Sequence, residues 1–281
     1  MTNAPAALSD DLPAKRVALL SWLRPRPCVV AFSGGVDSAT LAKALVEAKD
    51  AKPLGYFAVS ATTTAQERQD ALQLAEEVGI DLRVIETNEF SEPRFVENSP
   101  RRCYWCKKVR FDAIQQLANE ESGGAVAVLD GSNADDALDY RPGAQAAREV
   151  GVLSPFAELG ITKAEIRALA RAWGLSVAEK PSNPCLATRL AYGLALKEPV
   201  LRQVESAELV IQEVLKVPTC RARIDAPGIL RIELPEDAIG AAASCDVRVQ
   251  LVPRLRELGF KFVSLDLEGF FTGKNNRILE K

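Results

Sequence analysis

The chain has 281 residues, of which 47% are hydrophobic and 26% charged, so it can bury a full core and disorder is not expected. Its net charge of -3 gives no general reason to collect on nucleic acid, and no apolar stretch approaches the length of a membrane span. Six cysteines in a chain of this length, with no basic and apolar leader in the first dozen residues, predict a cytoplasmic protein. The sequence has no histidine, which removes the usual general base and the commonest metal ligand.

The first two thirds of the chain alternate between short β-branched apolar runs and helical patterns, which is typical of a parallel sheet flanked by helices. We predict an α/β fold with a five-stranded parallel sheet, its strands at residues 28–32, 54–59, 82–87, 125–129 and 152–153. Apolar residues repeat at helical spacing over 71–78 and 111–118. Thr162 and Glu165 form a capping-box pair that opens a further helix, which ends at Gly174.

The pattern changes after Gly174. A proline-bearing loop leads to a predicted helix over 200–215, and the later segments are two β-like runs (220–224 and 229–234), a helix near 252–258 and a strand at 262–267. This mixture predicts a smaller α+β domain. We therefore expect one domain over residues 1–194 and a second over residues 195–281.

The SGGVDS loop (residues 33–38) follows the first predicted strand and precedes a helix. Gly34 and Gly35 let the backbone bend and approach a ligand, and amides at a helix start point toward negative charge. The loop has no lysine, so it is not the GxxxxGK[ST] loop, and a grip on a departing pyrophosphate fits better. The alternative is an ordinary turn, but the end of the first strand of an α/β pattern is where ligands usually bind. The candidate nucleotide residues are Ser33, Gly34, Gly35, Val36, Asp37 and Ser38, with Asp37 also a candidate Mg²⁺ ligand and Ser60 assigned to the same site.

A second candidate loop follows the strand predicted at 125–129. Gly131, Asn133 and Asp136 offer a tight turn, an amide and a carboxylate to the same crevice. The alternative is that Asp135, Asp136 and Asp139 are solvated residues that cap a helix.

Three cysteines stand apart from the others. Cys103 and Cys106 lie three residues apart at an expected helix start, where the helix dipole and the flanking lysines and arginines favour thiolates that could share a metal or form a redox pair. Cys185 lies in SNPCLATRL, where Pro184 restricts the residue before it and predicts a shaped loop. A buried structural cysteine is the alternative for each, and it is the interpretation we prefer for Cys28, Cys220 and Cys245.

From residue 15 to 270, SGGVDS, RCYWCKK, GSNADDALDYRPG, KPSNPCLATRL, the arginine pair of CRARI and GFKFVSLDLEGF occur in an order that resembles the LarE family of ATP-dependent sulfur transferases, within the PP-loop ATP pyrophosphatases. The resemblance implies a PP-loop ATP-binding domain and a C-terminal domain for substrate binding and oligomerisation, with a hexamer as one candidate. It implies that ATP and Mg²⁺ adenylylate a carboxylate of a pyridinium-3,5-biscarboxylate mononucleotide. Sulfur then converts this carboxylate to a thiocarboxylate for the nickel-pincer nucleotide cofactor. Neither a stable nucleic-acid partner nor a membrane is expected.

The same resemblance offers two sulfur sources. Either Cys185 forms a thioester and surrenders its own sulfur, or Cys103, Cys106 and Cys185 hold a [4Fe-4S] cluster with an extra sulfide. Because the chain has all three cysteines, we predict the cluster type. Zinc is the competing metal, but a structural zinc site usually has four protein ligands and this chain has no histidine.

The substrate site is expected around an arginine pair. Arg221 and Arg223 alternate on a predicted strand and share a face, which suits bidentate binding of a phosphate, although such a pair can also be a solvated face. With the resemblance, the candidate substrate residues are Trp105, Arg189, Glu208, Arg221 and Arg223. The chain departs from the family pattern after Gly269, where Phe270 and Phe271 stand in place of an arginine and a small-residue turn.

Two other functions remain open. A tRNA-thiolating enzyme would keep the nucleotide chemistry, but the acidic balance and the lack of an RNA-binding module argue against it. A non-enzymatic ATP sensor with a structural metal would bind ATP without producing AMP.

Overall fold

The computed structural model describes residues 11–49, 52–138, 142–181 and 183–271, together with residues 274 and 277. Two compact units divide the chain: Met1–Glu92 with Arg101–Asn183, and Pro93–Pro100 with Pro184–Lys281. Each unit is described by itself, and the expected functional boundary at residue 194 stays a prediction. In the part of the chain that the structure describes, no helix combines the length and apolarity that crossing a bilayer requires.

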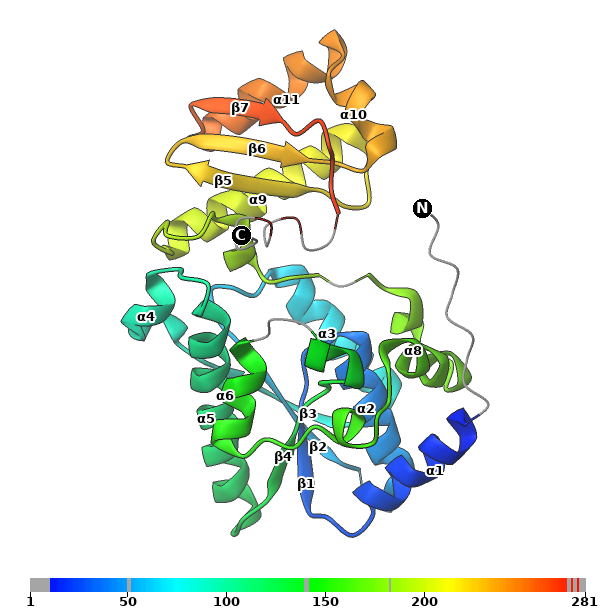
Figure 1. Cartoon of the computed structure of the whole chain (residues 1–281). Helices are drawn as coiled ribbons and strands as arrows, with labels where there is room; N and C mark the ends of the chain where they lie inside the picture. The colour runs from blue at the N-terminus through cyan, green and yellow to red at the C-terminus, as the bar shows by residue number, and fades with distance from the viewer. Residues whose placement is uncertain are drawn as a thin grey trace. The chain divides into compact units, whose positions relative to one another are not determined.

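The first unit contains a parallel sheet of four strands in the order β3-β2-β1-β4 (Figure 1). The strands are β1 (Cys28–Ala31), β2 (Leu54–Val59), β3 (Asp81–Glu86) and β4 (Ala127–Leu129). Neighbouring residues on a strand point to opposite faces, so Val30 packs into one hydrophobic core and Val29 into the other. The predicted parallel α/β architecture is confirmed.

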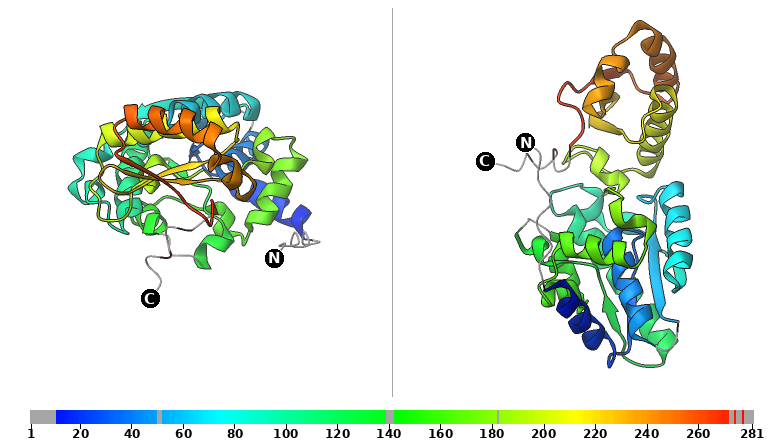
Figure 2. Two further views of the ribbon diagram at one scale, coloured as in Figure 1. Left: turned by 90° about the horizontal axis from the view of Figure 1, so that it is seen from above. Right: turned by 90° about the vertical axis from the view of Figure 1, so that its right-hand side faces the viewer.

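Helices cover both faces of this sheet, as Figure 2 shows. The larger core is formed with α1 (Leu12–Leu23), α2 (Val36–Ala48), α3 (Ala65–Val78) and α8 (Lys163–Ala172), and the smaller core with α5 (Arg102–Ser122) and α6 (Pro142–Val150). The predicted capping box opens α8, because the Thr162 hydroxyl accepts from the Glu165 amide while the Glu165 carboxylate accepts from the Thr162 amide. Short helical turns connect these elements: η1 (Glu89–Ser91), η2 (Ala134–Leu138), α7 (Pro155–Glu158) and η3 (Ser176–Glu179).

The expectation of a fifth strand at 152–153 is wrong for the described residues. Leu153 makes an isolated parallel bridge with Leu129, donating to Val128 and accepting from Asp130. The chain cannot extend this pairing, because Pro155 has no amide hydrogen and begins α7 two residues later.

The second unit contains a three-stranded sheet in the order β5-β6-β7. Strand β5 (Arg221–Ala226) is antiparallel to β6 (Ile229–Glu233), which is parallel to β7 (Phe262–Leu265). Helices α9 (Glu198–Leu215) and α11 (Cys245–Glu257) pack on this sheet, and the smaller α10 (Glu236–Ala242) joins them (Figure 2). The turns α4 (Pro93–Val96) and η4 (Leu186–Arg189) also belong to this unit. The predicted α+β character of this part is confirmed, although α11 begins earlier than the sequence indicated and α10 was not expected.

Candidate active site

The SGGVDS loop connects β1 to α2 through a turn that requires glycine. Gly34 has φ +72°, and a Cβ there would lie 3.0 Å from the Ala71 Cβ of α3. Gly35 is the N-cap residue of α2 and has no side chain to occupy the first amides of the helix. The Ser33 amide donates to the Ser38 hydroxyl at 3.1 Å, which closes the loop on itself. The Ser38 hydroxyl is buried and donates to the Gly35 carbonyl at 3.1 Å, whereas Ser33 is exposed. The loop therefore presents a helix N-terminus and the Ser33 hydroxyl, groups that suit an anion.

The loop after β4 packs directly on the start of α2. A Cβ on Gly131 would lie 2.8 Å from the Asp37 Cβ and 3.0 Å from the Ser38 amide nitrogen, so only glycine fits. Asn133 and Asp136 shape this loop, because the Asn133 side chain accepts from Asp135 and the Asp136 carboxylate accepts from the Asn133 amide. Their role in holding a nucleotide stays a prediction.

Two residues that hold this region together, Asp130 and Lys163, were not predicted from the sequence. Asp130, 6% exposed, accepts from the Ser132 amide and from the hydroxyls of Ser132 and Ser154, which fixes the end of β4. Lys163, at the first position of α8, forms an ion pair with Asp37. A lysine in the first turn of a helix opposes the helix dipole. This unfavourable position was the signal that Lys163 has an anionic partner.

Asp37 has a carboxylate oxygen that could bind Mg²⁺. Its Oδ2 binds Lys163, whereas its buried Oδ1 has no hydrogen-bond partner among the described residues. A carboxylate oxygen is the ligand type that Mg²⁺ prefers, and phosphate oxygens would supply further ligands. Asp37 therefore fits a magnesium ion bound with a nucleotide.

Ser60 lies just beyond β2 in a buried polar network. Its hydroxyl and that of Thr62 accept from Arg110 of α5 at 3.1 and 3.0 Å. Arg110 also pairs with Glu89, which is fully buried and accepts from the Thr87 hydroxyl at 2.9 Å. This network joins the ends of β2 and β3 to α5.

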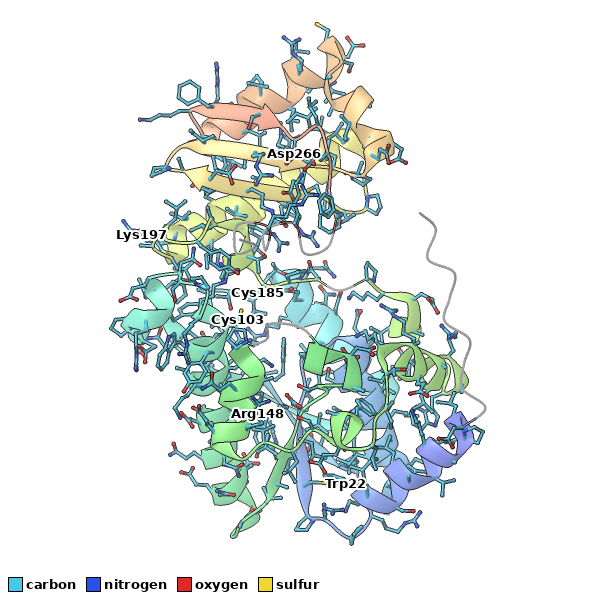
Figure 3. All side chains as sticks on the ribbon, in the orientation of Figure 1. Trp22, Cys103, Arg148, Cys185, Lys197 and Asp266 are labelled. Atoms are coloured by element: carbon cyan, nitrogen blue, oxygen red, sulfur yellow. The ribbon has the colours of Figure 1, made fainter. Side chains whose placement is uncertain are left out.

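Cys103 and Cys106 lie in the first two turns of α5, as the sequence predicted, and Figure 3 labels Cys103. Cys103 is exposed and Cys106 is half-buried. Trp105 stands between them in the sequence and packs edge-on against Tyr104 at 4.5 Å. Lys108, one of the flanking cations, is paired with Asp112 one turn later.

Cys185 lies in the second unit, at the start of η4. Its carbonyl accepts from the Thr188 amide at 3.0 Å and hydroxyl at 2.8 Å. Arg189 donates to the Pro184 carbonyl at 2.7 Å, so the loop that carries the half-buried Cys185 is held at several points. The predicted shaped loop is confirmed. Among the described residues, no group of three or more cysteine, aspartate or glutamate side chains is gathered as a metal site.

Arg189 and Glu208 bind each other through two bonds. Arg189 Nε and Nη2 lie 2.8 and 3.1 Å from the two carboxylate oxygens, and Glu208 also accepts from the Ala222 amide at 3.0 Å. Both residues thereby brace η4 and α9 against β5. Their contact with a substrate stays a prediction.

The two arginines of β5 have different surroundings, although both are buried. Arg223 is paired with the fully buried Glu233 and donates to the Thr188 carbonyl at 2.7 Å. Arg221 donates only through Nη1, to the Cys220 carbonyl at 2.7 Å and the Thr219 hydroxyl at 3.2 Å, and has no carboxylate partner among the described residues. Burial, followed by the nearby Arg189, lowers the pKa of Arg221. Arg221 is thus the better anion-binding candidate of the pair.

The other three cysteines were expected to be buried and structural, and the structure confirms this only in part. Cys220 is fully buried, and burial raises the pKa of its thiol to about 12. Cys28 is half-buried, and burial raises the pKa of its thiol. Cys245 lies in the first turn of α11 and is exposed, so the expected burial was wrong there.

The strand, glycine loop and helix of the first unit, with the β4 loop packed on them, define a PP-loop protein of the ATP-using superfamily. Residues 24–101 match the NAD synthase family. The chain is 35% identical over 272 residues to the pyridinium-3,5-bisthiocarboxylic acid mononucleotide synthase of Lactiplantibacillus plantarum, covering 96% of each protein. It is also 38% identical over 253 residues to the uncharacterized protein slr1717 of Synechocystis, covering 90% of this chain and 93% of the relative. A third relative, the uncharacterized protein MJ0830 of Methanocaldococcus jannaschii, is 28% identical over 240 residues, covering 85% of this chain and 89% of the relative.

At this identity and coverage the chain belongs to the LarE family, the family of the Lactiplantibacillus synthase.

Proposed function

We propose that this protein uses ATP to adenylylate a carboxylate of a pyridinium-3,5-biscarboxylate mononucleotide and converts it to a thiocarboxylate. The observation that carries the proposal is the SGGVDS loop, with Gly34 in the left-handed region and Asp37 at the start of α2. The name of the Lactiplantibacillus relative, which describes a synthase of a pyridinium bisthiocarboxylic acid mononucleotide, supports the choice of substrate.

The chemistry divides into two balanced steps. A substrate carboxylate oxygen attacks the α-phosphorus of ATP and displaces pyrophosphate, which the amides and hydroxyls of the SGGVDS loop would hold. Asp37 would hold Mg²⁺, which neutralises phosphate charge when bound. The product is an acyl-adenylate, whose carbonyl is a better electrophile than a free carboxylate because AMP is a good leaving group.

Sulfur then attacks the carbonyl and AMP leaves. In the route through Cys185, its thiolate forms a thioester; loss of the Cα proton and cleavage of the Cβ–S bond release the thiocarboxylate and leave dehydroalanine. In the alternative, Cys103, Cys106 and Cys185 would together hold a [4Fe-4S] cluster that supplies sulfide. Thiolates are suitable ligands for such a cluster.

The test is turnover with ATP, Mg²⁺ and the pyridinium-3,5-biscarboxylate mononucleotide, before and after anaerobic reconstitution with iron and sulfide. We expect equal amounts of AMP and pyrophosphate together with a thiolated product. Mass spectrometry of the protein then separates the sulfur sources. Loss of one hydrogen sulfide at Cys185 indicates the sacrificial route, and an intact Cys185 with product indicates the cluster route. Release of ADP instead of AMP, or thiolation of tRNA but not of the mononucleotide, would contradict the proposal.

A further inference from the structure

The segment that follows β7 reaches Arg221, which forms no ion pair with a described residue and has the Glu208 carboxylate as its nearby opposite charge. The Arg221 guanidinium carbon lies 4.7 Å from the centroid of the Phe270 ring, within the range of a cation–π contact. Arg221 is 6% exposed and Phe270 is half-buried, so the ring covers the guanidinium while remaining partly accessible itself. Figure 1 shows this segment running past the end of β6.

The position of Phe270 is fixed by the backbone around it. The Phe270 amide donates to the Leu234 carbonyl at 2.8 Å, just beyond the end of β6. Gly269 has φ +71°, and a Cβ there would lie 2.6 Å from the same carbonyl oxygen, so the turn requires glycine. Asp266, labelled in Figure 3, donates its amide to the Ile232 carbonyl at 2.9 Å and binds Arg231 through its carboxylate. The turn is therefore tied to β6 at Asp266 and to the residue after β6 at Phe270, which fixes the backbone from which the Phe270 ring extends to Arg221.

The hydrogen bonds of Arg221 leave a defined part of its guanidinium for a ligand. Both of its described acceptors, the Cys220 carbonyl and the Thr219 hydroxyl, bind Nη1. The Nε and Nη2 groups, which form the fork that binds a carboxylate or phosphate with two bonds, have no acceptor among the described residues. An aromatic ring against a guanidinium face restricts its rotation and leaves the donor edge free.

We propose that Phe270 is a positioning residue for the substrate's anionic group: its ring holds Arg221 so that Nε and Nη2 receive a phosphate or carboxylate oxygen. The inference rests on the proposed function, because it assigns Phe270 to the site that would take the pyridinium mononucleotide. Phe270 acts through Arg221 and carries no part of the ATP chemistry.

The test compares F270L, F270Y and F270W in the full-length protein by calorimetric titration with the pyridinium-3,5-biscarboxylate mononucleotide. F270L removes the ring and should raise Kd about fivefold to tenfold, the loss expected for one partly buried cation–π contact. F270Y and F270W keep an aromatic face and should bind as the wild type does or more tightly. The Kd for ATP should not change in any variant, and equal melting temperatures exclude a general loss of structure.

Binding of the mononucleotide to R221A distinguishes an error about Phe270 from an error about the proposed substrate site. If R221A weakens mononucleotide binding but F270L binds as the wild type does, the role of Phe270 is refuted and the proposed substrate site stands. If wild type and R221A bind the mononucleotide equally, the proposed substrate site itself fails. Should F270L not fold, F270Y and F270W still decide, because an aromatic series with Kd values far above the wild type would refute the proposal.

Discussion

At the scale of single residues, the first unit brings together two side chains, Lys163 and Asp37, that lie far apart in the sequence. The SGGVDS loop contains no lysine, yet Lys163 from the start of α8 lies against Asp37 of that loop. The loop thus receives a cation from a helix that is distant in the sequence. We expect Lys163 to bind a phosphate oxygen when ATP occupies the loop, and Asp37 to be released for Mg²⁺.

The substitution K163M tests this role. A hydrogen bond to a charged group contributes about 1.5–3 kcal/mol, so kcat/KM for ATP should fall about tenfold to a hundredfold. Stability should change little, because both partners of the ion pair are roughly one-third exposed and solvent screens such pairs. The matched control is R16M, which removes a cation paired with Glu47 near the other end of α2. Steady-state kinetics and thermal unfolding of both variants provide the measurement, and equal kinetics for K163M and R16M would contradict the assignment.

At the scale of elements, the sequence predicted the helices and strands whose ends are set by residues close to them in the chain. The capping box at Thr162, the four strands of the sheet and the cysteine pair at the start of α5 were all predicted. The prediction of a fifth strand was wrong because the pairing at Leu153 ends where Pro155 begins α7, and a short apolar pattern does not reveal this.

The site was predictable to a similar limit. The SGGVDS loop and Gly131 were chosen as candidates because glycine-rich phosphate loops leave a sequence pattern, and the structure confirms that Gly34 and Gly131 stand where a Cβ would crowd a neighbour. Their binding of a nucleotide stays a prediction. Arg223 was assigned to substrate, but its partner Glu233 lies on the neighbouring strand, and only the pairing of β5 with β6 shows that its charge is compensated. The contact of Phe270 with Arg221 is likewise tertiary and had no signal in the sequence.

The buried network of Glu89 and Arg110 gives a prediction about α5. R110M would leave a fully buried carboxylate without its cation, which costs about 3–5 kcal/mol in unfolding free energy. The double variant R110M/E89Q removes the charge and should recover part of this loss. Chemical denaturation measures both. If R110M alone is as stable as the wild type, this pair does not hold α5 to the ends of β2 and β3.

At the scale of the whole molecule, the candidate ATP residues belong to the first unit and the arginine candidates for substrate anions to the second. The ATP candidates are positioned by the close contacts of Gly34 and Gly131 within the first unit. Arg221 and Arg223 are positioned by the pairing of β5 with β6 within the second unit. We infer that the two ligands are bound by largely independent sets of residues.

Crossed binding measurements test this independence. G131A places a Cβ against the backbone of Asp37 and Ser38, where overpacking costs about 1–3 kcal/mol, and should raise the Kd for ATP about tenfold without changing the Kd for the mononucleotide. R221A should do the reverse, because it removes only the guanidinium of the second unit. G124A is the matched control, since a Cβ at Gly124 meets no atom within 4 Å. Independent sites give additive free energies, so the double variant G131A/R221A should show both single effects unchanged. Loss of both affinities in either single variant would refute the independence of the two sets of residues.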